Sequence, residues 1–290
     1  MLRPAALLAA AALALAVGAC GSDDNDTAAT TPAATTATTA ASDACAKDGL
    51  AVRTAGTLTI GTDKPAYPPY FEDDDPTNGK GFESAVAYAI AGKLGFTRDE
   101  VKWTTVPFNA SYAPGKKKFD FDVNQISVTP DRSKVVDFSS PYYTASQAVV
   151  VPKDSTLAPT TLAELKDAKI GVQIGTTSLE AVDRSINPNG KAQVFNDSND
   201  VVSALKQKRI DAVVVDLPTA FYITAAQVEG ARIVGQFDAP GGDEWGALFE
   251  KGSKLTPCVN QAIAELKSSG ELDRLTQRWM GKAQGAPKLG

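Results

Sequence analysis

Short runs of β-branched and apolar residues alternate along the chain with segments in which apolar residues recur every three or four positions. This alternation is typical of strands and amphipathic helices that follow one another. Phe82, Val86 and Ile90 are spaced four residues apart and predict a helix that ends at Gly95. Because strand and helix alternate, we expect an α/β unit with largely parallel strands. The elements expected in this first unit are strands over residues 57–63, 101–106 and 120–128 and a helix over residues 82–94.

A second α/β series begins near Gln147 and continues to about residue 226. Its most apolar run, residues 210–215, is expected to be its most buried strand. The pattern therefore predicts two α/β units in tandem. The elements expected in the second unit are strands over residues 148–151, 169–174, 193–195 and 210–215 and helices over residues 161–165, 177–184, 198–207 and 217–226.

The last part of the chain, after Gly241 and Gly242, predicts one strand over residues 244–249 and helices over residues 257–268 and 271–280. These helices have no further strand to cover, so we expect them to pack back on the first unit. That unit would then be discontinuous in the sequence. The predicted division of the folded region is a first lobe over residues 46–147, a second lobe over residues 148–238 and a return to the first lobe, with C-terminal helices and tail, over residues 239–290.

The composition is that of a soluble folded protein, because hydrophobic residues make up 43% and charged residues 22% of the 290 residues. At roughly 150 residues per domain, this length suggests about two compact units. The net charge is −5 and the longest basic run is Lys116-Lys117-Lys118, so we expect no nucleic-acid partner. The absence of histidine excludes Ser-His-Asp triads, Cys-His pairs and histidine-ligated metals. Binding or carboxylate-based chemistry remains, without a metal or other cofactor.

The N-terminus has the pattern of an export signal. Arg3 precedes an apolar stretch over residues 5–17, which is shorter than the roughly 20 residues that span a bilayer. Residues 17–20, Val-Gly-Ala-Cys, resemble a bacterial lipobox, so we expect residues 1–19 to be removed and Cys20 to carry lipid. A generic signal peptide with an incidental cysteine is the alternative. Small and polar side chains dominate residues 20–45, which predicts a disordered tether.

Cys45 and Cys258 remain in the exported chain. In an oxidising compartment two spare cysteines favour one disulfide. This bridge would tie the start of the folded region to the C-terminal helices. Two unpaired thiols are the alternative.

Ligands of open α/β sheets bind beyond the carboxyl ends of the strands, so residues after each predicted strand are candidates for a site. Thr177 and Glu180 have capping-box spacing, and the helix N-terminus there would either hold an anion or be an ordinary cap. Thr129 and Pro130 predict a helix start that places Arg132 in the first turn. A cation there opposes the helix dipole. Arg132 is therefore expected to bind a carboxylate, either of a ligand or of a structural ion pair.

Two acidic positions complete the candidate site. Asp216 ends the strand over residues 210–215 and is either an acceptor for an ammonium group or a helix N-cap. Asp63 follows the first strand beside several aromatic residues, which suits an organic cation, although turn formation and packing would explain the same residues. Together, an arginine, a helix N-terminus, an aspartate and an aromatic slot suit a free α-amino acid. The aromatic residues are Tyr67, Tyr70, Phe71 and Phe108.

The chain resembles the amino-acid-binding solute-binding proteins of ABC importers, solute-binding family 3, from about residue 56 to residue 280. The most specific part is residues 127–143, Ser-Val-Thr-Pro-Asp-Arg-Ser-Lys-Val-Val-Asp-Phe-Ser-Ser-Pro-Tyr-Tyr. The resemblance implies a type II periplasmic-binding-protein fold of the α/β class, in which two lobes joined by two hinge strands close on the ligand. The other matching segments are residues 58–63, 81–83, 170–177 and 209–216.

The resemblance also implies roles for the candidate residues. Arg132, Thr177 and Thr176 would bind the α-carboxylate of the ligand. Asp216 and Ser127 would hold its α-ammonium group. The residues expected around the ligand side chain are Asp63, Tyr67, Tyr70, Phe108, Gln125 and Gln173.

Three stretches depart from the family pattern. Asn124 and Gln125 stand where smaller residues are common, and residues 109–119 replace a helix that leads to a Gly-Lys turn. The stretch after Asp63 is one residue longer than usual. Either Tyr67 or Tyr70 is therefore the ring that stacks on the ligand.

The function implied by the resemblance is capture of a polar or charged amino acid by a monomeric extracytoplasmic lipoprotein, which delivers it to an ABC permease. Such a protein is not an enzyme, and its lipid anchor holds it on the outer face of the bacterial cytoplasmic membrane. One alternative is a cyclohexadienyl-type dehydratase on the same fold, with Glu83 or Asp63 as the acid. Another is a ligand-sensing receptor domain that reports to a separate signalling partner.

Overall fold

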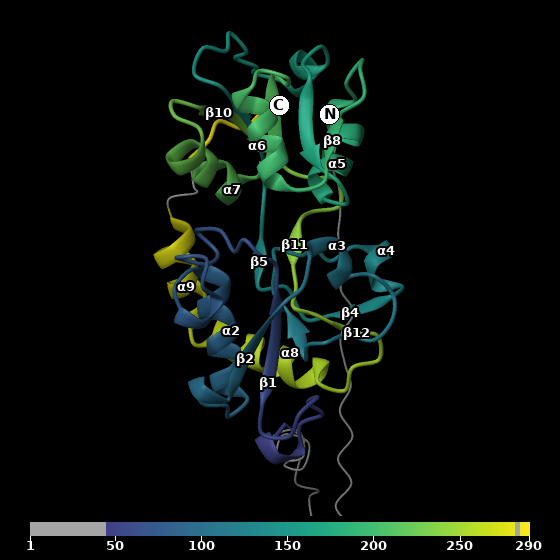
Figure 1. The fold of residues 1–290 in the computed structure, drawn as a ribbon, viewed down its shortest axis with the longest axis vertical. Coiled ribbons are helices and arrows are strands. Elements are labelled where there is room, and N and C mark those ends of the chain that lie inside the picture. Colours follow the sequence, from purple (N-terminus) through teal and green to yellow (C-terminus); the bar gives the residue numbers. More distant parts are fainter. Residues whose placement is uncertain (1–44, 282–284) are drawn as a thin grey trace, which may run out of the picture.

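The computed structural model describes residues 45–281 and 285–290, which form two α/β lobes stacked along the long axis of the molecule (Figure 1). The predicted signal peptide over residues 1–19, the lipid site at Cys20 and the tether up to residue 44 lie outside the described residues. No helix in the described part of the chain combines the length and the apolar character that crossing a membrane requires.

Lobe 1 is built on a five-stranded sheet in the order β2-β1-β3-β12-β4. Its first three strands are parallel, whereas β12 runs antiparallel to β3 and to β4. β1 is an inner strand whose residues are buried along nearly its whole length, with little alternation between buried and exposed positions. This is expected of a strand that is covered on both faces. The strands are β1 (Leu58–Thr62), β2 (Val101–Thr105), β3 (Phe121–Asp122), β4 (Val136–Phe138) and β12 (Leu248–Glu250).

Lobe 2 repeats this arrangement in a sheet with the order β10-β6-β9-β7-β8. β7 is parallel to β8 and β9, and β6 runs antiparallel to β9 and to β10. In each sheet one strand therefore runs against the other four. The strands are β6 (Gln147–Val151), β7 (Ile170–Gln173), β8 (Gln193–Phe195), β9 (Ala212–Asp216) and β10 (Arg232–Phe237).

A ribbon of two short strands joins the lobes (Figure 1). β5 (Tyr143–Thr144) and β11 (Glu244–Trp245) pair antiparallel, with Tyr143 opposite Trp245. β5 leads into β6, the antiparallel strand of the lobe 2 sheet, and β11 leads into β12, the antiparallel strand of the lobe 1 sheet. In each sheet, the antiparallel strand therefore enters from the other lobe. The ribbon confirms the expectation of two lobes joined by two hinge strands.

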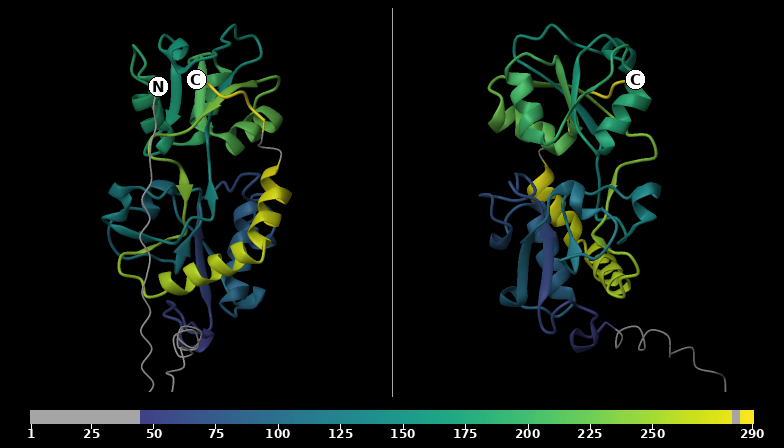
Figure 2. Two further views of the ribbon diagram at one scale, coloured as in Figure 1. Left: turned by 180° about the vertical axis from the view of Figure 1, so that it is seen from behind. Right: turned by 45° about the vertical axis from the view of Figure 1, so that its right-hand side comes forward.

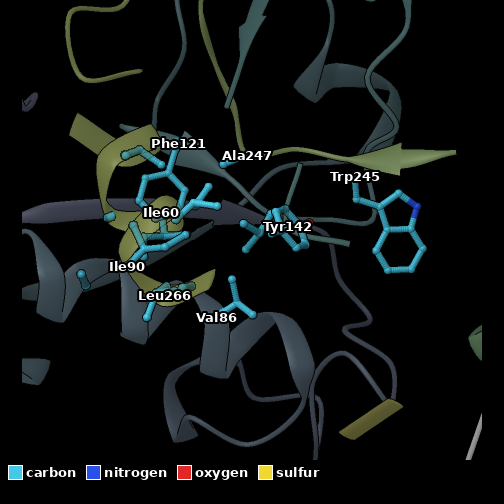
Figure 3. Packing of buried hydrophobic residues seen from close by; sticks show 14 of the residues in the cluster. Ile60, Val86, Ile90, Phe121, Tyr142, Trp245, Ala247 and Leu266 are labelled. Carbon is cyan, nitrogen blue, oxygen red and sulfur yellow. The ribbon is translucent and has the colours of Figure 1, made fainter. Parts of the chain in front are cut away.

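Three helices cover lobe 1 and share one apolar core with its sheet. Val86 and Ile90, from the helix over residues 82–93, pack against Leu266, from the helix over residues 256–268. They also pack against Ile60 and Phe121 of the sheet (Figure 3). Each fully buried aliphatic side chain of this kind stabilises the fold by about 1.5–3 kcal/mol. Although two of these helices follow lobe 2 in the sequence, they lie along lobe 1 (Figure 2). The helices are α2 (Phe82–Lys93), α8 (Thr256–Ser268) and α9 (Glu271–Met280).

A disulfide joins Cys45 and Cys258, whose Cα atoms lie 5.4 Å apart. This bridge confirms the predicted pairing, and the alternative of two unpaired thiols is wrong. Cys258 lies in the first turn of α8, so the bridge ties the beginning of the described chain to lobe 1. Removal of a native disulfide typically costs about 2–5 kcal/mol of stability in a small exported domain.

The last residues of the chain pack on lobe 2. Leu289 is buried in the lobe 2 core and covers Gly235, and Lys288 bridges to Gln236 of β10. The prediction that all of residues 239–290 return to the first lobe is therefore wrong for this tail. The physical reason is that β10 is an edge strand, whose free backbone groups pair with the tail.

Several short elements differ from the predictions. The strand expected over residues 120–128 is only two residues long, because Gln125 has a φ of +48° that turns the chain away. The strand expected over residues 244–249 is divided into β11 and β12 at Gly246, which packs closely against Val128. β4, β5 and β10 have no counterpart in the prediction. The long helices and the strands β1, β2 and β6 to β9 agree with it to within two residues.

The helices of lobe 2 and the short helices of both lobes complete the fold. The helices expected over residues 177–184 and 217–226 begin as α-helices and continue as wider π-helical turns. The α-helices are α3 (Phe108–Ser111), α4 (Pro130–Ser133), α5 (Thr177–Ala181), α6 (Ser198–Lys206) and α7 (Leu217–Tyr222), with π-turns over Val182–Ile186 and Ile223–Gln227 and 3-10 turns over Lys47–Gly49, Pro76–Asn78, Arg98–Glu100 and Leu162–Leu165.

Candidate ligand-binding site

Two small cavities, of about 80 Å³ and 140 Å³, lie between the lobes at the carboxyl ends of the central strands. Phe108, Asn124, Gln125, Gln173 and Ser198 line both, so the cavities are parts of one cleft. This is the place where open α/β sheets bind ligands. Of the other predicted residues, Ser127, Thr176, Thr177 and Asp216 line the first cavity, and Asp63 and Tyr67 line the second.

The lobes touch across this cleft through direct hydrogen bonds. The hydroxyl oxygens of Tyr70 and Thr219 lie 2.7 Å apart, and those of Ser127 and Thr177 lie 3.2 Å apart. These contacts hold the two lobes in a closed arrangement. Polar groups in a closed cleft are shielded from water, so each one left without a partner is costly.

Arg132 has its predicted place in the first turn of α4, where Thr129 Oγ1 accepts a hydrogen bond from the Arg132 backbone N–H at 3.2 Å. Arg132 is 9% exposed, and its guanidinium group donates to the carbonyl oxygens of Ser127 at 2.7 Å and Gly175 at 2.9 Å. The group also lies 4.6 Å from the ring centre of Tyr112. Arg132 takes part in none of the ion pairs of the described residues, so the predicted structural ion pair is wrong. It borders the cleft but lines neither cavity.

The helix start after β7 differs from the prediction by one residue. Thr176 is the N-cap of α5, and its Oγ1 accepts a hydrogen bond from the Leu179 backbone N–H at 3.2 Å. The predicted capping box of Thr177 and Glu180 is wrong, because Thr177 is already the first helical residue. Its hydroxyl instead donates to Asp243 Oδ2 at 3.2 Å.

Asp216 ends β9 and lines the first cavity. Asp216 occupies the N-cap position of α7, as one alternative predicted, but its side chain makes no capping hydrogen bond there. Asp216 Oδ1 accepts a hydrogen bond from Gln147 Nε2 at 2.7 Å, and the same nitrogen donates to Asp243 Oδ2 at 2.6 Å. Burial raises the pKa of Asp216 well above its usual range, and the carboxylate of Asp243 raises it further.

Asp63 lines the second cavity from the loop after β1. Its two carboxylate oxygens accept hydrogen bonds from the backbone N–H groups of Lys64 at 2.6 Å and Phe108 at 3.1 Å. Burial raises the pKa of Asp63, and the negative charge of Asp197 across the cavity adds to the effect. A ligand group of positive charge would be stabilised between these two carboxylates.

The two tyrosines that follow Asp63 have different surroundings. Tyr67 lines the second cavity, and its ring centre lies 5.9 Å from that of Tyr222 in lobe 2. Tyr70 is 2% exposed, packs edge-on against Trp245 in the lobe 1 core and lines neither cavity. The ring of Tyr67 therefore lines the cleft, whereas Tyr70 reaches it only through its hydroxyl group.

The buried carboxylate of Glu83 fixes the position of Gln125 through hydrogen bonds. The backbone N–H of Gln125 donates to Glu83 Oε1 at 2.7 Å, the Gln125 side-chain amide donates to Oε2, and the Tyr142 hydroxyl donates to Oε1. Burial raises the pKa of Glu83 to about 7. Beside Gln125, Nδ2 of Asn124 is buried in the cleft without a partner among the described residues, which leaves a donor for a ligand.

Sequence reasoning missed several polar residues at the cleft, among them Asp197, which lines the second cavity, and Gln147 and Asp243, which hydrogen-bond to residues of its wall. Gln147 carried a signal, since it is a polar residue at the start of an otherwise apolar strand. Asp243 carried none, because an aspartate after two glycines is typical of a turn. Thr219 and Ser198, whose hydroxyl donates to Gln173 Oε1 at 2.7 Å, lie at helix starts and looked like ordinary helix-terminal residues.

A larger hollow lies on lobe 2 at the amino ends of β7 and β9, beside Asp211 and Lys208. Open α/β sheets bind ligands at the opposite ends of their strands, so the interlobe cleft is the better candidate. Among residues 45–281 and 285–290, no group of three or more histidine, cysteine, aspartate or glutamate side chains is placed to hold a metal ion.

Known proteins are similar to this chain in sequence and in structure. The arginine-binding extracellular protein ArtP of Bacillus subtilis (strain 168) is 31% identical over 228 residues, which cover 77% of this chain and 85% of that protein. An ancestral arginine-binding protein bound to glutamine has 33% identity and a TM-score of 0.67, and the match covers 79% of this chain and 99% of the other. The ancestral amino acid-binding protein AncCDT-1, a precursor of cyclohexadienyl dehydratase, has 32% identity and a TM-score of 0.64, covering 77% and 95%.

The family of bacterial extracellular solute-binding proteins, family 3, matches residues 58–282. These residues include both sheets, the hinge ribbon and the three long helices of lobe 1. The fold is that of the two-lobed binding proteins that the sequence resemblance implied. The chain therefore belongs to family 3 of the bacterial extracellular solute-binding proteins.

Proposed function

We propose that the protein binds a free α-amino acid between its lobes and delivers it to an ABC permease. The observation that carries this proposal is a closed polar cleft that has Asp216 in its wall and Arg132 at its border. Neither residue forms an ion pair within the described residues. Two separate buried charges of opposite sign suit the ammonium and carboxylate groups of one zwitterion.

In this proposal Arg132 binds the α-carboxylate. The guanidinium now donates to two carbonyl oxygens, and a carboxylate is a stronger acceptor for its planar fork than a neutral carbonyl. The backbone of Thr176 and Thr177, beside Arg132 in a neighbouring hollow, adds donors. Asp216 and Ser127 hold the α-ammonium group from the other side.

The ligand side chain is proposed to be cationic or to end in an amide. Asp63 and Asp197 place two carboxylates at the second cavity, and the Tyr67 and Phe108 rings offer flat faces to a guanidinium or amide group. Gln125 and Gln173 add amide groups to the same wall. Relatives named for arginine binding, one of them with glutamine bound, agree with this class.

Binding rather than catalysis is the proposed activity. Glu83, one of the two acids considered for a dehydratase, is fully buried, accepts hydrogen bonds at both oxygens and lines neither cavity. A group in this position has no access to a bound substrate. The likeness to a precursor of a dehydratase is a likeness to a protein that is itself named for amino-acid binding.

The proposed location is the outer face of the cytoplasmic membrane, with a monomer anchored through lipid on Cys20. The support is the order of residues 17–20 and the small polar residues that follow them. Cys20→Ser should move the protein from the membrane fraction of expressing bacteria to the soluble exported fraction. An unchanged membrane fraction would show that Cys20 is not the anchor.

A thermal-shift screen of the twenty amino acids, cystine and ornithine tests the proposed ligand class. A ligand at one hundred times its Kd stabilises the folded protein by about 2.7 kcal/mol, and the melting temperature rises accordingly. We expect the largest rises with arginine and with the other cationic and amide side chains. A rise only with apolar or acidic amino acids would contradict the assignment of Asp63 and Asp197, and no rise with any compound would contradict amino-acid binding.

A further inference from the structure

The carboxylate of Asp243 lies beside that of Asp216, although the two residues come from different parts of the fold. Asp243 precedes the hinge strand β11 and is 1% exposed. Gln147 lies opposite Asp216 in the β6–β9 pair and donates to both carboxylates, at 2.7 Å for Asp216 and 2.6 Å for Asp243. The hydroxyls of Ser127 and Thr177, which line the first cavity, also bond to Asp243.

The two carboxylates have no cation as a partner in the described structure. Arg132 of α4 is the charged group that faces them, and its guanidinium is turned to the carbonyls of Ser127 and Gly175. The remaining titratable groups nearby are the hydroxyls of Tyr70 and Tyr143, which are neutral in the physiological range. In addition, Gln147 Oε1 is buried without a partner among the described residues, which leaves one hydrogen-bond acceptor beside the pair for a ligand.

Two carboxylates that share a buried site cannot both be ionised cheaply, so Asp216, beside Asp243, retains a proton to higher pH. Burial and the neighbouring charge both raise the pKa of Asp216. An ammonium group is the natural replacement for this proton, because it carries the same charge and has three donors.

We infer that Asp216 and Asp243 share one proton in the ligand-free protein and release it to solvent when the ammonium group of the ligand enters between them. Asp243 is then the second carboxylate of the ammonium site. One positive charge enters and one proton leaves, so the charge of the site is unchanged and no other reactant is needed. This inference rests on the proposed amino-acid function.

The pair persists when the lobes open, because its supports belong to lobe 2 and the hinge. Asp216 and Gln147 face each other in the lobe 2 sheet. The backbone carbonyl of Asp243 accepts a hydrogen bond from Ala145 N–H, between the hinge strand β5 and β6, at 2.8 Å. From lobe 1, Ser127 donates a hydrogen bond to Asp243 and the Arg132 guanidinium faces the pair. A ligand that enters the open cleft therefore meets both carboxylates already in place.

Carbon-13 NMR titration of the aspartate carboxyl groups tests the shared proton without any ligand. In the wild-type protein we expect the Asp216 resonance, assigned separately from that of the buried Asp122, to titrate well above the usual midpoint of about 3.9. Asp243→Asn should lower that midpoint, because it removes the like charge but keeps the shape. If Asp216 of the wild-type protein titrates in the usual range, the inference is wrong, whatever the protein binds.

Calorimetry with L-arginine tests the exchange. Titrations at one pH in buffers of different ionisation enthalpy give the number of protons released, which should approach one below the midpoint found by NMR. The Kd should then fall about tenfold for each pH unit gained. The ammonium and guanidinium groups of arginine keep their own protons in this range. Arginine that binds with buffer-independent heat would overturn the exchange and leave the proposed function intact, whereas arginine without any binding heat would count against both.

Glu83→Gln is the matched control for the source of the proton. The pKa of the Glu83 carboxyl is about 7, so this buried acid is the rival source near neutral pH. It contacts Gln125 and Tyr142 rather than the aspartate pair. Proton release should persist in Glu83→Gln and disappear in Asp243→Asn. The reverse pattern would assign the proton to Glu83 and overturn the inference.

Discussion

Asp216→Ala should abolish amino-acid binding without lowering the melting temperature of the ligand-free protein. The α-ammonium group would lose its principal charged partner in a cleft closed to water, which costs about 2–5 kcal/mol, or roughly 30- to 4,000-fold in Kd. Stability should be nearly unchanged, because Asp216 makes no cap bond, and removal of a buried acid offsets the loss of its hydrogen bond from Gln147. Calorimetric titration with L-arginine and thermal unfolding of the same preparation measure the two effects.

Asp183→Ala is the matched control, since it removes an exposed aspartate from the same lobe. The control should bind arginine as the wild-type protein does. A Kd of Asp216→Ala within threefold of the wild-type value would show that Asp216 is not the ammonium acceptor. A strong loss of melting temperature would instead assign it a structural role.

Arg132→Ala should weaken binding by a similar factor and also loosen the closed arrangement. The variant loses the proposed carboxylate partner, and it loses the hydrogen bond from Nη2 to the Gly175 carbonyl that joins lobe 1 to lobe 2. Arg132→Lys should lie between the two proteins, because lysine keeps the charge but cannot present a planar fork. Titration calorimetry gives the affinities, and small-angle scattering with and without arginine reports closure.

Lys134→Ala is the matched control for Arg132. It removes a cation two residues away that pairs with Asp131 at the surface, where ion pairs contribute little. We expect unchanged affinity and closure for this control. Full affinity in both Arg132 variants would contradict a carboxylate clamp at this position.

The parts of the fold that follow from local pattern were predictable from the sequence. Phe82–Lys93 is a largely apolar segment and Glu271–Met280 an amphipathic one, and both helices lie where the sequence pattern predicts them. β4 and the hinge strand β5 have only three and two residues and exist because a partner strand lies beside them. Pairing of this kind is decided by tertiary structure, so residue propensity does not reveal it.

The site shows the same division between local and distant contacts. Asp63 and Asp216 could be found because they end strands whose position the pattern predicts. The orientation of the Arg132 guanidinium depends on a carbonyl in the other lobe, and Asp243 reaches the cleft through a hinge that joins distant segments. Nothing in the sequence between Asp216 and Asp243 indicates that their side chains lie side by side. These features become visible only when the two lobes are placed together.

A crystal structure of the protein with L-arginine bound tests the central claim most directly. We expect the ligand to lie in the interlobe cleft, with its ammonium nitrogen within hydrogen-bond distance of Asp216 and its carboxylate within reach of Arg132. Its guanidinium group should lie near Asp63, between the Tyr67 and Phe108 rings. An arginine bound with its ammonium group away from Asp216, or bound in the hollow beside Asp211 and Lys208, would contradict the account.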